Sequence, residues 1–113
     1  MLFRSKISYL SIEKNGKLLL SSSNSIIEIP LLIKNGGLIR ILEKSNLIIK
    51  GGGICNNNCT INVTKNSKLT FEYNPFAFLP HGEIIGNGLV NIKSIFYPPL
   101  VLNSMISDRK SVV

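Results

Sequence analysis

Short apolar runs alternate with polar positions along most of this chain, and Gly or Asn follows nearly every run. The clearest stretch is KSNLIIKGGGICNNNCTINVTKNSKLTFEY at 44–73, in which Ile61 and Val63, and then Leu69 and Phe71, alternate with polar residues. Such period-two alternation is typical of a strand with one buried face. No segment keeps the i, i+3, i+4, i+7 spacing of an amphipathic helix over three turns. The pattern therefore predicts an all-β fold.

The turns between these runs share their chemistry. They read KNGK, KNGG, KNSK and GNGL, and the two KNG tripeptides begin at Lys14 and Lys34. Further strands are expected at 5–13, 18–20, 26–29, 31–33, 38–42, 84–85, 89–92 and 95–97. Repeated turn chemistry at a fixed period favours a solenoid of stacked coils, in which Asn side chains can form ladders. The even spacing also fits an antiparallel sandwich or meander. Parallel pairing at a lag of about 20 residues would favour the solenoid, and antiparallel pairing at about 10 the alternative.

Four segments, GGLIRI, SNLIIKGGG, CTINVTKNSKLTFEY and EIIGNGLVNI, resemble the coils of right-handed parallel β-helix proteins, namely the pectin-lyase-like superfamily and its adhesin-type relatives. The resemblance covers roughly residues 15–97 and implies four to five coils of about 20 residues, with Ile, Leu and Val inside. Polysaccharide lyases of this superfamily use Asp-rich calcium sites. This chain has no Asp before Asp108, so the resemblance does not extend to that activity.

The chain has 113 residues, 44% of them hydrophobic, which predicts one domain. We expect a single solenoid-like domain at 1–102 and a polar C-terminal tail at 103–113. No secretory signal and no apolar stretch of about 18 residues is visible, so no membrane span is expected. The compartment stays open, and would be extracellular if the chain belongs to a longer surface protein. Self-association through uncapped coil ends is one expected partner interaction.

The formal net charge is +7, and lysines recur at the expected turns. In a stack of coils, Lys14, Lys34, Lys44 and Lys65 would form a basic stripe able to bind an acidic glycan or nucleic acid. Lysines also simply solvate turns and protect sheet edges. With three Arg and no interleaved aromatic residues, sequence-specific nucleic-acid readout is not indicated.

Candidate chemistry is sparse. Cys55 and Cys59 bracket three asparagines. They form a disulfide if this segment is a looped-out corner and the compartment is oxidising, and otherwise remain two thiols on a turn, the alternative that the sequence favours. Two Cys and a distant His81 fall short of four zinc ligands, and no cofactor is expected. His81 reads as a loop residue, and Gly51–Gly53 as a tight backbone corner without the Lys-Ser/Thr of a phosphate loop.

The acidic residues also point away from catalysis. The glutamates lie among strand and turn positions typical of solvated charges, at Glu13, Glu28, Glu43, Glu72 and Glu83. Hydrolysis by paired carboxylates would need two of them to converge. The first hypothesis is therefore a non-enzymatic structural or interaction module, such as a piece of an adhesin-type surface protein. The second is a binder of anionic polymers through the lysine stripe, and a salt titration would separate the two.

Overall fold

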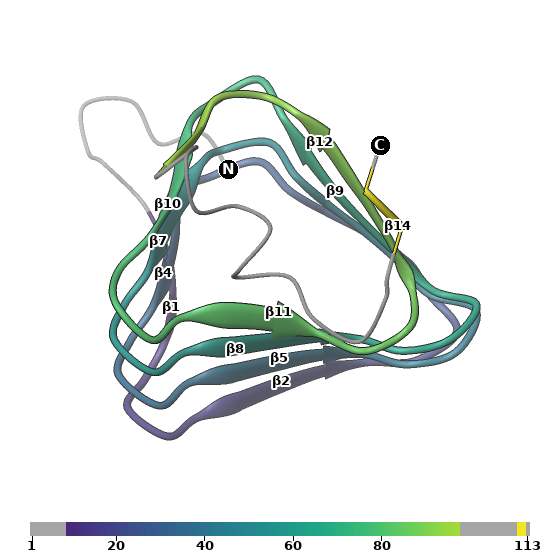
Figure 1. Ribbon diagram of the computed structural model, residues 1–113, viewed down its shortest axis with the longest axis horizontal. Helices are drawn as coiled ribbons and strands as arrows, with labels where there is room; N and C mark the ends of the chain where they lie inside the picture. Colours follow the sequence, from purple (N-terminus) through teal and green to yellow (C-terminus); the bar gives the residue numbers. More distant parts are fainter. Residues whose placement is uncertain (1–8, 98–110, 113) are drawn as a thin grey trace, which may run out of the picture.

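The chain winds into a parallel β-solenoid of about four coils, seen nearly end-on in Figure 1. The computed structural model describes residues 9–97 and 111–112. Each coil contributes one strand to each of three parallel sheets, which form the walls of a triangular tube. The solenoid prediction is confirmed, and the antiparallel alternative is wrong because all described strand pairs run parallel.

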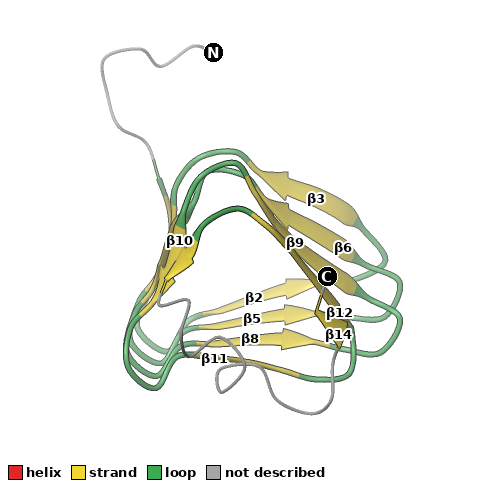
Figure 2. Ribbon diagram, turned by 45° about the horizontal axis from the view of Figure 1, so that its top comes forward, coloured by secondary structure: helices red, strands yellow, loops and turns green. Residues whose placement is uncertain are grey.

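The three sheets contain the following strands. Sheet A consists of β1 (Leu10–Ile12), β4 (Leu31–Ile33), β7 (Gly53–Cys55), β10 (Phe76–Phe78) and β13 (Phe96–Tyr97). Sheet B consists of β2 (Lys17–Leu20), β5 (Leu38–Ile41), β8 (Thr60–Val63) and β11 (Glu83–Ile85). Sheet C consists of β3 (Asn24–Ile27), β6 (Asn46–Ile49), β9 (Lys68–Glu72), β12 (Leu89–Lys93) and β14 (Ser111–Val112). Figure 2 shows the three walls from a tilted view.

The length of a coil varies slightly along the solenoid. The shortest repeat in the described chain separates Phe76 from its register partner Phe96, and the repeat from Gly53 to Phe76 is slightly longer. The strands stay in register because the corners absorb the difference. Residues equivalent by register form columns along the solenoid axis, and the period seen in the sequence, about 20 residues, is close to this repeat.

The interior of the tube is filled by aliphatic and aromatic columns. One column reads Leu18, Ile39, Ile61 and Ile84, which pair by register across sheet B. Phe71 and Phe76 pack with ring centroids 4.9 Å apart where sheets C and A meet. Burying one such side chain stabilises the fold by about 1.5–3 kcal/mol. This continuous core explains why the inward positions of every wall are mostly apolar.

The expected tail at 103–113 is only partly described. Ser111 and Val112 form β14, which pairs with β12 and so extends sheet C. The other tail residues lie outside the described part of the chain, and the boundary at 102 stays a prediction. Among the described residues, no helix is long and apolar enough to cross a membrane.

Candidate functional site: the corners and outer faces of the solenoid

The corner between sheets A and B is a stack of four equivalent turns. In each, the fourth residue donates its backbone N–H to the carbonyl of the first, as from Gly37 to Lys34 at 2.8 Å and from Cys59 to Asn56 at 3.1 Å. The third residue has a positive φ in every coil, at Asn15 (58°), Gly36 (75°), Asn58 (61°) and His81 (67°). This geometry is typical of type II turns, which explains the Asn and Gly at the third position and Pro80 at the second. His81 is thus an exposed turn residue, as predicted.

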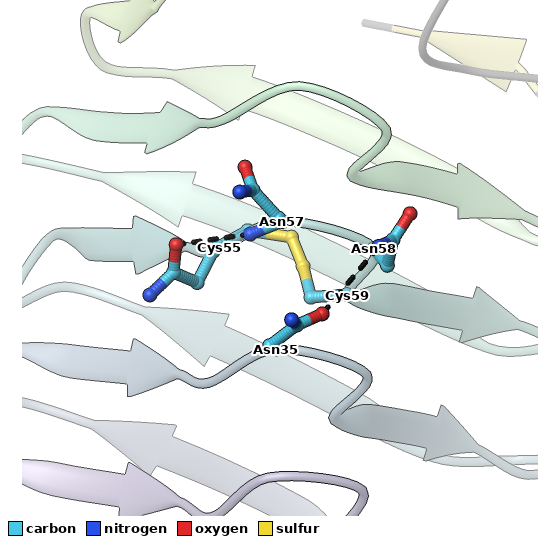
Figure 3. The surroundings of a disulfide bond; sticks show 6 residues. Asn35, Cys55, Asn57, Asn58 and Cys59 are labelled. Carbon is cyan, nitrogen blue, oxygen red and sulfur yellow. Dashed lines mark hydrogen bonds between the residues drawn. A yellow bond between two sulfur atoms is a disulfide. The ribbon is translucent and has the colours of Figure 1, made fainter.

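Cys55 and Cys59 form a disulfide across this corner, with their Cα atoms 5.7 Å apart (Figure 3). Cys55 ends β7, Cys59 ends the following turn, and both residues are fully buried. The sequence left their redox state open, and the structure joins them. The equivalent residues one coil earlier are Ile33 and Gly37. The pair therefore occupies core positions, and the disulfide forms across an ordinary turn, without the looped-out corner expected from the sequence.

The four lysines of the expected stripe are divided between two corners. Lys14 and Lys34 lie between sheets A and B, whereas Lys44 and Lys65 lie between sheets B and C. Even within a corner they are offset by one residue: Lys34 stacks on Glu13, with Nζ 2.8 Å from Oε1. This hydrogen bond from Lys34 lowers the pKa of the exposed Glu13 carboxyl and raises the pKa of Lys34. The structure therefore divides these lysines between two corners and does not align them in one stripe.

The corner between sheets B and C is stabilised by buried hydroxyl groups. Ser67 Oγ lies 2.6 Å from the carbonyl oxygen of Thr64 and 3.1 Å from that of Ile41 in the preceding coil. Ser45 Oγ donates in the same way to the Leu20 carbonyl, at 3.3 Å. Both serines are buried, so these contacts satisfy groups that water cannot reach. They mark this corner as structural.

The asparagine ladders are short. At the start of sheet C, Asn46 Nδ2 donates to Asn24 Oδ1 at 2.8 Å, and the next position along this column is Lys68. At the corner between sheets A and B, Asn58 Nδ2 lies 3.5 Å from Asn35 Oδ1, a weak contact. The predicted ladders therefore exist, but in the described chain each of them joins only two coils.

The corner between sheets C and A contains the triple glycine. Gly52 and Gly53 have φ values of 71° and 145°, and a Cβ on Gly51 would collide with the backbone of Ile29 in the preceding coil. Only glycine allows this close approach, so the interpretation as a tight corner is confirmed. Two contacts join this corner to the next coil: Lys50 Nζ lies 5.4 Å from the ring centroid of Tyr73, and Asn74 Nδ2 donates to the Lys50 carbonyl at 2.8 Å.

The outer face of sheet C is polar and shallowly grooved. A groove of about 360 Å³ crosses β3, β6, β9 and β12, and is lined by Asn24, Ser25, Ile26, Asn46, Ile48, Lys68, Thr70, Glu72, Asn91 and Lys93. At the edge of this groove, one column alternates in charge from coil to coil, because the register continues through Glu28, Lys50, Glu72 and Lys93. Opposite charges on neighbouring parallel strands favour this register.

The outer face of sheet A has the opposite character. Its outward positions form two columns: Tyr9, Pro30, Gly52, Pro75 and Ile95 just before the strands, and Ser11, Leu32, Ile54 and Ala77 in their middle. None of these nine described residues is charged. An almost wholly apolar pocket of about 250 Å³ lies here, lined by Tyr9, Pro30, Leu31, Leu32, Gly53 and Ile54. We call these two columns the sheet A face.

Nine large hydrophobic residues are exposed in the described chain, and three of them, Tyr9, Ile54 and Ile95, lie on the sheet A face. Ile29 and Leu79 lie at the corners on either side of its strands, and Leu10 is in β1 but belongs to the inward column that continues to Leu31. The other three are Tyr73, which directly follows β9 of sheet C, Leu19 on sheet B and Ile26 on sheet C. This face was not predicted from the sequence. Aligning the chain coil by coil, as Leu10 aligns with Leu31 and Gly53, would have shown its two uncharged columns.

No two of the five glutamates occupy neighbouring register positions. Glu28 and Glu72 share a column, but Lys50 lies between them. Glu13 and Glu43 lie at two different corners. Within the described residues, no three His, Cys, Asp or Glu side chains group as metal ligands would.

Comparison of the chain with family models, with curated proteins and with solved structures found no match. Its function is therefore inferred from the fold and its surfaces.

Proposed function

We propose that this chain is a non-enzymatic interaction module that docks a partner protein on the sheet A face. The observation that carries the proposal is a wall of a basic solenoid that has no charged residue in its two outward columns and exposes Tyr9, Ile54 and Ile95, of which Tyr9 and Ile54 line an apolar pocket. Contiguous apolar patches of this kind mark protein-interaction surfaces, because leaving them in water costs free energy. A parallel sheet with rigid, stacked corners offers such a surface in preformed shape.

Two further features support an extracellular setting for this module. The Cys55–Cys59 disulfide fits an oxidising compartment. The coil pattern resembles the adhesin-type surface relatives of the pectin-lyase-like superfamily. A module of this kind would act by presenting a rigid wall and would need no catalytic group.

A second candidate is binding of an acidic glycan or nucleic acid. The net charge of +7 supports it. The division of Lys14, Lys34, Lys44 and Lys65 between two corners weakens it, since a linear polyanion would contact one pair at a time. A salt titration of heparin binding separates the candidates: attachment to the lysines should fall steeply between low and physiological salt.

The test of the docking face uses Nile red, a neutral dye that fluoresces in apolar surroundings. Ile54 is 42% exposed at the centre of the sheet A face. We expect Ile54→Lys to reduce dye fluorescence clearly. The matched control is Ile26→Lys, because Ile26 is an outward residue of sheet C with 54% exposure. Equal dye binding by both variants and the native chain would contradict the proposal.

A further inference from the structure

The partner of the sheet A face can be narrowed by charge, and the inference rests on the docking face proposed above. The sheet A face carries no charged residue among its described positions, while the chain as a whole carries +7. An acidic partner would be drawn to the lysine corners instead. A second copy, which carries the same +7, meets least repulsion where charged side chains are missing. The charge distribution thus favours a second copy on this wall.

The sheet A face also matches itself. The order of its strands is β1-β4-β7-β10-β13, with β7 at the centre. A two-fold axis in the interface plane along β7 exchanges β4 with the second copy's β10. Ile54 then packs against Ile54 of the second copy, and Leu32 packs against Ala77, so that a large side chain meets a small one. Isologous contacts require this kind of self-complementarity.

The column that precedes the strands has the same symmetry. Pro30 and Pro75 are placed equally on either side of Gly52, and Tyr9 and Ile95 occupy its two ends. The same two-fold axis places Ile95 of the second copy opposite Tyr9. Tyr9 lines the apolar pocket of about 250 Å³, and an isoleucine from the second copy could fill it. Tyr9 and Ile95 are exposed by 55% and 57%, so both are available for this contact.

We propose that two copies of this chain associate through their sheet A faces, with the solenoid axes antiparallel and Ile54 on the two-fold axis. Five strands about 4.8 Å apart and a few residues long give a footprint on the order of 300 Å². This is well below the roughly 800 Å² per partner of a stable dimer. The association is therefore weak and reversible, and it forms only at high local concentration, as on a crowded surface.

Sedimentation equilibrium over a range of protein concentrations tests the proposal. The weight-average mass of the native chain should rise from 12.5 kDa toward twice that value. The rise should be stronger in high salt, because salt screens the repulsion between the two copies. Ile54→Lys should remain monomeric at every concentration. The controls Ile26→Lys and Leu19→Lys should associate like the native chain, since both residues are 54% exposed on the other two walls.

Cross-linking tests the two-fold axis itself. Ile54→Cys should link to itself through a short bis-maleimide faster than Ile26→Cys does. Leu32→Cys should link faster to Ala77→Cys than to itself, because the axis places these two residues opposite one another. Thermal unfolding of each variant checks that it is folded.

The outcomes separate the two proposals. A native chain that stays monomeric, yet binds Nile red at Ile54, overturns the self-association and leaves the docking face in place. A monomer whose dye binding does not respond to Ile54→Lys overturns both. Association that persists in Ile54→Lys overturns the face-to-face dimer in favour of contacts at the coil ends, where β1, β2 and β3 are edge strands.

Discussion

Cys59 occupies in the third coil the position that Gly37 holds in the second. A Cβ on Gly37 would lie 2.8 Å from Cγ2 of Ile33, four residues earlier, so the isoleucine fills the space and the corner needs glycine. In the next coil Cys55 replaces the isoleucine and Cys59 the glycine, and the two sulfur atoms share the same space. The disulfide therefore takes the place of the contact between Ile33 and Gly37 in the preceding coil.

This equivalence predicts that the disulfide can be replaced by the neighbouring pair of residues. Closing a five-residue loop should stabilise the fold by about 2 kcal/mol. The double variant Cys55→Ile/Cys59→Gly loses that stabilisation but refills the core. The control Cys55→Ala/Cys59→Ala loses the same stabilisation and also leaves a cavity. Urea unfolding should therefore rank the native chain first, the Ile/Gly variant second and the Ala/Ala variant last. An Ala/Ala variant as stable as Ile/Gly would contradict the equivalence.

Gly37 should be intolerant of even one added methyl group. Its φ is not in the left-handed region, so the cost of Gly37→Ala comes from crowding against Ile33 and the Lys34 carbonyl. Overpacking of this kind costs about 1–3 kcal/mol. Gly16 is the matched control, because a Cβ there would meet the same turn carbonyl at 3.0 Å but keep 3.5 Å from Ile12 Cγ2. Chemical denaturation should show a clearly larger loss for Gly37→Ala than for Gly16→Ala; equal losses would refute the crowding by Ile33.

Ser67, which is buried at the corner between sheets B and C, should contribute to the free energy of unfolding. Ser67→Ala removes the hydroxyl that contacts the carbonyls of Thr64 and Ile41. A hydrogen bond contributes about 0.5–1.5 kcal/mol, and its loss here leaves buried acceptors without this donor. Ser21→Ala, at an exposed position of the equivalent corner, should change the free energy of unfolding by less than about 0.5 kcal/mol. Equal effects of the two substitutions would show that the Ser67 hydroxyl is dispensable.

The Glu13–Lys34 pair predicts a specific pH dependence. The folded pKa of Glu13 lies below its ordinary value of 4.5, so its contribution to stability is present above that value and is lost as pH falls through the folded pKa. Lys34 has a raised pKa, so its contribution is present below its ordinary 10.5 and is lost as pH rises through the folded value. Both side chains are exposed, and the effect on stability is small.

Carboxyl NMR is the measurement suited to this pair. Lys34→Met should raise the titration midpoint of Glu13 toward 4.5, because it removes the main cause of the lowered pKa. Lys14→Met is the control, since Lys14 lies at the same corner but does not hydrogen-bond to Glu13. A midpoint unmoved by Lys34→Met would show that the pair does not persist in solution.

The sequence predicted the strands and the core of this fold better than it predicted which side chains lie together on the outer faces. Alternation and recurring Asn-Gly corners favoured parallel coils but also fitted an antiparallel sandwich, because both folds need an aliphatic interior and turns that accept a positive φ; the repeated turn chemistry decided the choice. The lysine stripe was harder, since it depends on register to within one residue. The spacing of Lys14 and Lys34 falls one residue short of the coil repeat there, which runs from Leu10 to Leu31. Lys34 therefore stacks on Glu13.

The same one-residue offset between lysines occurs at the corner between sheets B and C. The spacing of Lys44 and Lys65 is also one residue short of the local repeat in sheet C, which runs from Asn46 to Lys68. The sheet A face escaped detection for a related reason. Its residues are far apart in the sequence and individually ordinary, and only the register of neighbouring coils reveals that a whole wall lacks charge.

The register between β5 and β8 also has a bearing on how such a chain can change in length. Thr60 lies directly beside Leu38 in sheet B. Deleting residues 38–59 would therefore join Gly37 to β8, which lies next to β5 and would take its place. The excised piece holds both cysteines, and no unpaired sulfur would remain. A gene encoding this solenoid could thus lose or duplicate one coil at a time and still encode a chain whose coils stack in register.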